Sequence, residues 1–331
     1  MTNNPAIGFK IEKKDLSYVG KGLSRPECII AQPDGTLLVS DANGVMRINA
    51  DGSQHLIRRK SNYDRNYPGK EPATNGFALM PNGNMLIANF GTDVIEEMSP
   101  DGTCRLVMDE FNGKRLGSTN FILRDPKEGY WASISTYEPD SFAAHNGNWG
   151  PNDGFVMRVD SRGPRVVADG IRFTNECRLD ARGQFLYAVE SFGCCIARFP
   201  IKADGSCGPK ELFGPADLGG VPDGIAFDEA GNLWVTLIGV DQLGFITPQG
   251  DLHIVLELGL PERAKSFRAA FKERRVGYDD LLTVSDDNVR VLTSITFGGP
   301  DRKTVFLGSI MGESLPSFRS PVAGLPLAHW K

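Results

Sequence analysis

Five polar residues each stand eight or nine positions before a glycine in a turn-like context, and a short apolar run follows each glycine. The pairs are Glu27 with Gly35, Asn75 with Gly83, Asn120 with Gly129, Asn175 with Gly183, and Asp223 with Gly231. The apolar runs are rich in leucine, aromatic and β-branched residues, which is typical of β-strands. The pattern therefore predicts a repeated β unit in which a polar residue precedes a strand, a tight turn and a second strand.

A second turn follows within most units, and glycine supplies the positive φ that tight hairpins need. These turns are Asp51-Gly52, Asp101-Gly102, Arg162-Gly163, Asp204-Gly205 and Gln249-Gly250. Each unit then contains four strands. The five polar residues lie 48, 45, 55 and 48 positions apart by subtraction of their numbers. A period of this length predicts the four-stranded blades of a β-propeller.

A sixth unit is visible at residues 293–301, with a strand beginning at Thr304. We therefore expect an all-β fold, in which residues 1–331 form one six-bladed β-propeller around a central channel. The blades are expected to begin near residues 23, 71, 115, 171, 219 and 290. Residues 9–19 and 321–330 are expected to complete one blade between them and so to close the ring. The Trp-Asp signature of a common seven-bladed repeat does not occur in the sequence.

Three segments interrupt the repeat, at residues 58–71, 137–153 and 260–277. The third is predicted to be helical because Pro261 lies near its start and Phe267 and Phe271 are one helical turn apart. Its many basic residues indicate a helix face in contact with solvent. A lid over a site or a contact between subunits is the alternative interpretation.

The composition of the chain excludes several classes of partner. The chain has 331 residues, 40% of them hydrophobic, which is enough for a large core. Its 36 Lys and Arg residues face 41 Asp and Glu residues, a net charge of −5, so we do not expect a nucleic-acid partner. No apolar stretch of signal-peptide or membrane-spanning length occurs, which favours the cytoplasm and no membrane contact. The oligomeric state stays open.

Several common chemistries lack their motifs here. The sequence has only four histidines and no His-Glu-x-x-His pair, no Gly-x-Ser-x-Gly elbow and no phosphate-binding glycine loop. Its six cysteines form no Cys-x-x-Cys pair, so we expect them to be small buried residues in a reducing compartment.

The repeated polar residues carry the strongest chemical signal. Arranged around an axis, they would converge, with carboxylates from Glu27 and Asp223 and amide oxygens from the three asparagines. Such oxygen donors suit a hard divalent cation, calcium above all, while Mg²⁺, Mn²⁺ and Zn²⁺ stay open. The alternative is that Asn and Asp are ordinary turn formers. However, the turns lie eight residues later, so turn chemistry does not require these positions.

Four pieces of the sequence resemble the superfamily of gluconolactonase, regucalcin (senescence marker protein) and luciferin-regenerating enzyme. They are Arg25-Pro26-Glu27, Asn120 in its Ser-Thr-Asn context, Pro222-Asp223-Gly224, and Phe-Gly-Gly-Pro-Asp at 297–301. The resemblance extends from Gly22 to Trp330. It implies a six-bladed propeller with one divalent ion in the central channel, and metal ligands at Glu27, Asn120, Asn175 and Asp223. Asn75 is not a standard ligand of the family, so we place it facing the substrate.

The sequence departs from the family beside these ligands. Asn120 is followed by Phe121, Asn175 is followed by Glu176, and Ser118 stands where some members carry arginine. Since residues beside the ligands line the pocket, we expect these three to contact the substrate. From the interrupting segment 137–153 we add Tyr137 and His145, although His145 is also consistent with a plain surface histidine.

The resemblance implies metal-dependent hydrolysis of a lactone, most simply a sugar-acid lactone. Asp223 is then the candidate catalytic residue, acting as general base on water or carrying a proton to the leaving alkoxide. Two alternatives are a fluorophosphatase-like phosphotriester hydrolase and a calcium-binding or partner-binding propeller without catalysis.

Overall fold

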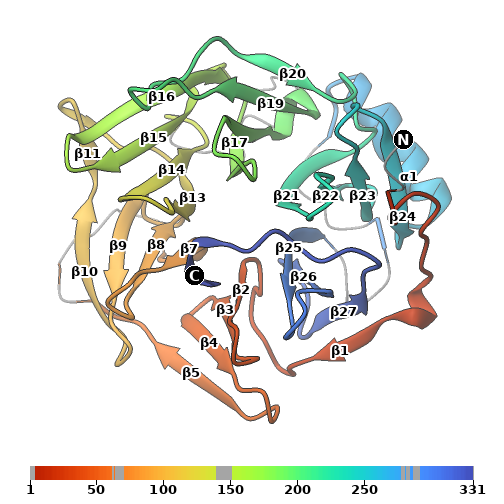
Figure 1. The fold of residues 1–331 in the computed structure, drawn as a ribbon, viewed down its shortest axis with the longest axis horizontal. Helices are drawn as coiled ribbons and strands as arrows, with labels where there is room; N and C mark the ends of the chain where they lie inside the picture. Colours follow the sequence, from red (N-terminus) through yellow and green to blue (C-terminus); the bar gives the residue numbers. More distant parts are fainter. Residues whose placement is uncertain are drawn as a thin grey trace.

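The computed structural model describes residues 4–61, 63, 71–138, 151–276, 280, 284–285 and 291–330. These residues form six antiparallel sheets ranged around a central axis, which confirms the predicted six-bladed β-propeller (Figure 1). The innermost strands β2, β7, β13, β17, β21 and β25 surround the axis, and each sheet then steps outward in chain order, except that the N-terminal strand is outermost in the sixth sheet.

The strands of the six sheets have the following bounds. The first sheet contains β2 (Ile29–Ala31), β3 (Leu37–Asp41), β4 (Gly44–Ile48) and β5 (Gln54–Arg58). The second contains β7 (Thr74–Leu79), β8 (Met85–Asn89), β9 (Val94–Met98) and β10 (Thr103–Met108). The third contains β13 (Thr119–Arg124), β14 (Tyr130–Ile134), β15 (Gly154–Asp160) and β16 (Gly163–Ile171). The fourth contains β17 (Thr174–Leu179), β18 (Phe185–Glu190), β19 (Cys195–Pro200) and β20 (Glu211–Phe213). The fifth contains β21 (Val221–Phe227), β22 (Leu233–Ile238), β23 (Gln242–Ile246) and β24 (Leu252–Glu257). The sixth contains β25 (Leu292–Gly298), β26 (Thr304–Ser309), β27 (Leu315–Arg319) and β1 (Ser17–Val19).

A few short elements decorate this ring. β6 (Lys60–Ser61) extends the second sheet by pairing in parallel with β10, and β11 (Glu110–Phe111) forms a hairpin with β12 (Lys114–Arg115). The residues that the structure describes also contain the 3₁₀ turns η1 (Lys13–Asp15), η3 (Ser191–Gly193) and η4 (Ala328–Trp330).

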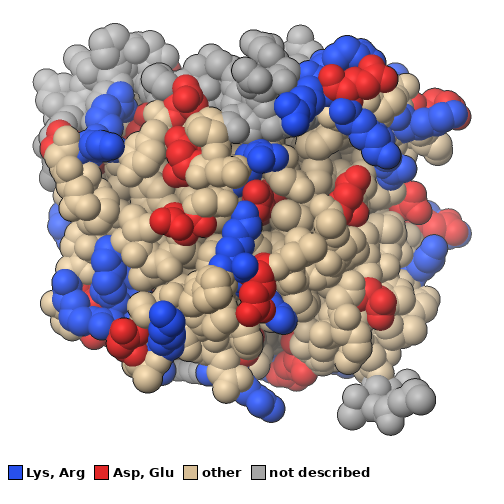
Figure 2. Space-filling model, turned by 90° about the horizontal axis from the view of Figure 1, so that it is seen from above, with Lys and Arg blue, Asp and Glu red and all other residues tan. Residues whose placement is uncertain are grey.

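The helix expected within residues 260–277 is confirmed as α1 (Pro261–Lys272), with proline in its first turn as predicted. α1 packs on the residues that lead into β21, where the Arg268 Nε–H donates to the Gly219 carbonyl at 2.9 Å. No helix in the described part of the chain is long and apolar enough to cross a membrane. On the face drawn in Figure 2, basic and acidic side chains are interspersed.

The two ends of the chain meet the ring in different ways. β1 pairs with β27, so the N-terminal strand completes the sixth sheet. Residues 321–330 were expected to share in that blade, and this expectation is wrong, because they add no strand to it. Instead they cross the ring: the Leu325 N–H donates to the Phe227 carbonyl at 2.8 Å, and His329 Nε2 lies 2.8 Å from the Ala31 carbonyl (Figure 1). Phe227 and Ala31 end β21 and β2, so this C-terminal strap lies at the end of the channel where the innermost strands finish.

The core is built between neighbouring sheets, with two fully buried tryptophans at its heart. Each donates its indole N–H to an aspartate in the turn before its own strand, Trp131 to Asp125 at 2.8 Å and Trp234 to Asp228 at 2.9 Å. A buried indole N–H needs such an acceptor. The same contact in two sheets reflects the repeat and fixes the turns at the ends of β13 and β21.

Innermost strands approach each other most closely at glycines. A Cβ on Gly224 would lie 2.4 Å from both the Thr293 carbonyl oxygen and the Ser294 Cα of the neighbouring strand. We expect Gly224→Ala to lower the free energy of unfolding by about 1–3 kcal/mol, since two backbones would have to separate. Urea titration measures the loss. Gly208→Ala is the control, because its Cβ would meet only ordinary contacts at 3.4 Å; an equal loss in both variants would contradict the interpretation.

Burial lowers the pKa of His329 below its usual 6.5, and nearby Arg124 acts in the same direction. The unfolded chain then binds a proton more readily than the folded one, so His329 contributes stability above pH 6.5 that is lost as the pH falls below it. We expect wild-type protein to lose more thermal stability than His329→Gln when acidified from pH 7.5 to 5.5. Parallel melting curves for both proteins would argue against this role.

Candidate metal and catalytic site

A register irregularity interrupts the start of the innermost strands β7, β13, β17, β21 and β25. The pairing with the next strand shifts between Thr74 and Phe77, Thr119 and Phe121, Thr174 and Cys177, Pro222 and Ile225, and Leu292 and Ile295. In the first four strands the predicted polar residue lies inside the shift: Asn75, Asn120, Asn175 and Asp223. A β-bulge re-aims side chains that the regular pleat would send elsewhere. The repeated polar position is therefore a bulge position.

Hydroxyl groups from neighbouring elements satisfy the backbone around the predicted polar residues. Ser40 Oγ accepts the N–H groups of Glu27 and Cys28, both at 2.9 Å. Thr236 Oγ1 accepts the Gly224 N–H at 2.9 Å, and Ser191 Oγ donates to the Pro222 carbonyl at 2.8 Å. Sequence analysis missed these supports. Their signal was present for Ser40 and Thr236, which lie near the ends of the strands after the repeated turn.

Three buried carboxylates from separate sheets influence one another. Burial raises the pKa of Asp223 well above its usual value, and the charges of Glu27 and Glu176 raise it further. Burial also raises the pKa of Glu27, against the opposing effect of Arg25, and raises the pKa of Glu176 to about 7, against Arg178. Glu27 and Asp223 were predicted to converge, and the effect of the Glu27 charge on Asp223 is consistent with that prediction. The raised pKa values mean that burial disfavours the ionised form of all three carboxylates.

Two arginines offset part of this charge, and neither was predicted from sequence. The Arg25 Nη1–H donates to Glu27 Oε2 at 2.9 Å, and the Arg178 Nη2–H pairs with Glu176 Oε2 at 2.8 Å. Arg178 also lies with its guanidinium carbon 4.5 Å from the centre of the Phe121 ring. Glu176 and Arg178 are two residues apart on β17, a spacing that tends to put both side chains on one face of a strand. That spacing was the available signal.

The asparagines use their amides differently. Asn75 donates through Nδ2 to the Asn120 carbonyl at 2.9 Å, while its Oδ1 accepts from Arg25 Nη2 at 2.7 Å. Asn175 donates through Nδ2 to Ser191 Oγ at 3.2 Å. The buried Asn175 Oδ1 accepts no hydrogen bond from any residue that the structure describes. An unpartnered buried acceptor in a native protein calls for an explanation such as a bound water or ion.

The other residues that we predicted to contact a substrate lie in different environments. Ser118 is buried and its N–H donates to the Thr136 carbonyl at 2.9 Å. Phe121 lies inside the ring against Arg178. Glu176 is one of the three buried carboxylates described above, and its charge raises the pKa of Asp223. Tyr137 is 40% exposed and packs on Phe155, 5.5 Å between ring centres. His145 lies outside the described residues. Contact of any of these with a substrate stays a prediction.

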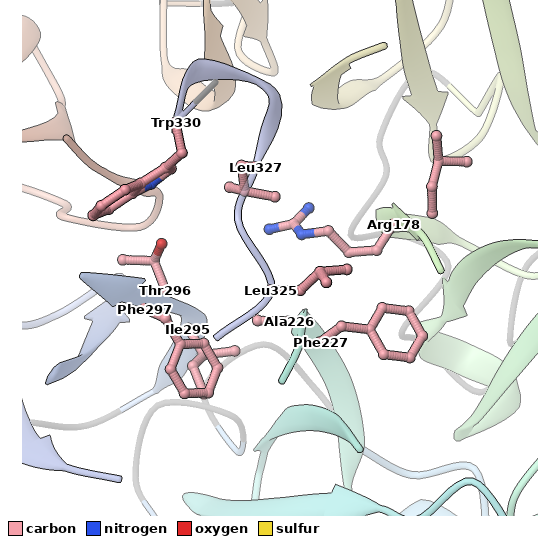
Figure 3. A pocket seen from close by; sticks show the side chains of 10 residues that line it. Arg178, Ala226, Phe227, Ile295, Thr296, Phe297, Leu325, Leu327 and Trp330 are labelled. Atoms are coloured by element: carbon pink, nitrogen blue, oxygen red, sulfur yellow. The ribbon is translucent and has the colours of Figure 1, made fainter. Parts of the chain in front are cut away.

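The C-terminal strap lies across the far end of the channel (Figure 3). Arg178 reaches a small cavity of ≈ 30 Å³ there, lined also by Thr296 and by Leu325, Leu327 and Trp330 of the C-terminal strap (Figure 3). A volume of this size holds about one water molecule. Glu176, Phe121 and Arg178 therefore fill the interior between the bulged residues and the strap.

The donor set at the bulges fits a divalent cation. No group of three or more His, Cys, Asp and Glu side chains suited to hold a metal occurs among the described residues, so an ion here would need amide oxygens as well. Asn175 Oδ1 is such an oxygen without a partner, and Glu27 and Asp223 carry charge that the two arginines only partly offset. Carboxylates with amide oxygens are ligands that calcium accepts readily.

Removing Arg178 should show how strongly the folded state depends on the ion pair between Arg178 and Glu176. Arg178→Met leaves Glu176 without its partner, so we expect a loss of about 3–5 kcal/mol in the free energy of unfolding. The double variant with Glu176→Gln should recover most of that loss, since no charge is then stranded. Urea titration compares the two. Arg198→Met, whose partner Glu211 is 40% exposed, should cost far less; a double variant no more stable than Arg178→Met would refute the pairing argument.

Comparisons with known proteins agree with this fold. The family described as the SMP-30/gluconolactonase/LRE-like region matches residues 25–266. Gluconolactonase of Zymomonas mobilis is 26% identical over 281 residues, 79% of this chain and 76% of that protein. Among solved structures, a Xanthomonas campestris gluconolactonase aligns at a TM-score of 0.61 with 18% identity, covering 94% of this chain and 88% of that one. A calcium-binding regucalcin from Agrobacterium tumefaciens aligns at 0.67 with 14% identity, covering 98% and 99%. Since the family match covers well over half of its length, and the sheets form the same fold, this chain belongs to the SMP-30/gluconolactonase/LRE-like family.

Proposed function

We propose that this protein is a metal-dependent hydrolase that opens a sugar-acid lactone. The observation that carries the proposal is the electrostatic effect of buried Glu27 on buried Asp223, together with an Asn175 Oδ1 that has no partner among the described residues. Membership of the family and the likeness to a gluconolactonase support the reaction class. The structural likeness to proteins below 25% identity supports the fold alone.

Four residues would hold the ion: Glu27, Asn120, Asn175 and Asp223. When bound, a divalent cation supplies Lewis acidity at the ester carbonyl. Calcium is the ion that this donor set favours, because it tolerates irregular oxygen geometry. Ser40 and Ser191 act behind the ligands, by fixing the backbone of Glu27 and the amide of Asn175. Such supporting hydrogen bonds orient ligand side chains.

Asp223 is the residue that we assign to proton transfer. The water oxygen forms a bond to the carbonyl carbon while Asp223 takes the proton that the water loses. The ring C–O bond then breaks, and the proton passes to the leaving alkoxide oxygen, which gives the open hydroxy acid. Because a cation-bound carboxylate is a weak base, orientation of the water is also part of this role.

Asp223→Asn keeps the size of the side chain and removes its basicity. We expect at least a 100-fold loss of lactone hydrolysis, the lower bound for a lost general base, with an unchanged circular dichroism spectrum. Proton release from gluconolactone and a panel of other sugar-acid lactones measures the rate. Asp251→Asn, an exposed carboxylate in the turn before β24, is the matched control and should retain full activity.

Removal of the metal tests the same proposal from the other side. Protein stripped with a chelator should lose lactone hydrolysis and regain it on addition of CaCl₂. Calcium binding without hydrolysis of any lactone would favour a binding propeller instead. Full activity after complete metal removal would defeat the proposed chemistry.

A further inference from the structure

Arg25 is held in an unusual backbone conformation beside the proposed ion ligands. Its φ is +56°, in the left-handed region that side chains other than Gly, Asn and Asp rarely adopt. The next two residues turn sharply, so that the Glu27 N–H donates to the Arg25 carbonyl at 2.8 Å. A strained residue persists only where its surroundings over-determine it. The contacts of its side chain are what hold Arg25 in place.

The Arg25 guanidinium has three hydrogen bonds around the site. Nη1 donates to Glu27 Oε2 and to the Thr74 carbonyl, both at 2.9 Å, and Nη2 donates to Asn75 Oδ1 at 2.7 Å. The Asn75 oxygen is therefore turned to Arg25, and its nitrogen to Asn120. The side chain of Arg25 is 23% exposed and that of Glu27 is 10% exposed, so water screens this pair only weakly.

The charges around the bulges show what Arg25 does. Glu27, Glu176 and Asp223 together carry three negative charges when ionised, and Arg178 offsets the one on Glu176. The positive charge of Arg25 lowers the pKa of Glu27, against the effect of burial, and it also lowers the pKa of Asp223. A second cation bound by Glu27 would be a close neighbour of the guanidinium, and like charges at such range repel strongly in a buried site.

We propose that Arg25 is a built-in competitor of the metal ion, a guanidinium that neutralises Glu27 and orients Asn75 until a divalent cation takes its place. The inference rests on the proposed metal-dependent function. It assigns to Arg25 a control over metal affinity, distinct from the roles of the ligands. If Arg25 only supported the ligands, its replacement would lower the affinity for the metal, whereas replacement of a competitor should raise that affinity.

Isothermal titration of chelator-treated protein with CaCl₂ separates the two signs. Arg25→Met keeps most of the side-chain stem and removes the charge, so we expect calcium to bind at least tenfold more tightly than to wild type. Arg25→Asn removes the charge in a residue that tolerates positive φ better, and should shift affinity in the same direction even if Arg25→Met fails to fold. Without calcium both variants should melt below wild type, and saturating calcium should close the gap.

Arg198→Met is the matched control, because it removes one positive charge on the outer part of the fourth sheet and should leave calcium affinity within about twofold. Unchanged or weaker calcium binding by both Arg25 variants overturns the inference and leaves the proposed function standing. Failure of wild type and variants alike to bind CaCl₂, MnCl₂ or ZnCl₂ overturns the proposed metal-dependent function together with the inference.

Discussion

The bulge at the start of the innermost strands is the constraint on which the site depends. A regular strand sends successive side chains to opposite faces, so its inward positions follow a strict alternation. An irregular register releases one or two residues from that alternation, and Asn75, Asn120, Asn175 and Asp223 all occupy such positions. The freed backbone groups must then find other partners, as the Gly224 N–H does in Thr236 Oγ1. Polar convergence and hydroxyl support are therefore two consequences of one backbone feature.

Burial at these bulges explains the chemistry of the site as well as its shape. Taking carboxylates out of water raises their pKa and makes a compensating cation favourable. The chain supplies part of that compensation itself, with Arg25 beside Glu27 and Arg178 beside Glu176, while Asp223 forms no such ion pair with any residue that the structure describes. The carboxylate that we assign to proton transfer is thus the one whose charge the protein leaves least compensated.

The sequence was sufficient for features that repeat. The spacing of Glu27, the three asparagines and Asp223 predicted the six-bladed ring, because every sheet obeys the same period. The convergence of Glu27 with Asp223 stays a prediction. The sequence was insufficient for features that occur once. Arg25 contacts Asn75 fifty residues away, and such a contact depends on which sheets become neighbours. The C-terminal strap was misplaced for the same reason, because no periodic pattern marks residues 321–330.

The filled interior restricts how a ligand can reach the bulged residues. Beyond them, Phe121 stacks against Arg178, Arg178 pairs with Glu176, and the strap from Leu325 to Trp330 lies across the end of the channel. We therefore propose that a substrate approaches from the end where the innermost strands begin. α1 packs at that end, over Gly219 and the turn at Gly239, close to the entrance of β21. Under the proposed function, selectivity among lactones would therefore depend on side chains at that end of the ring, and not on the regular parts of the strands.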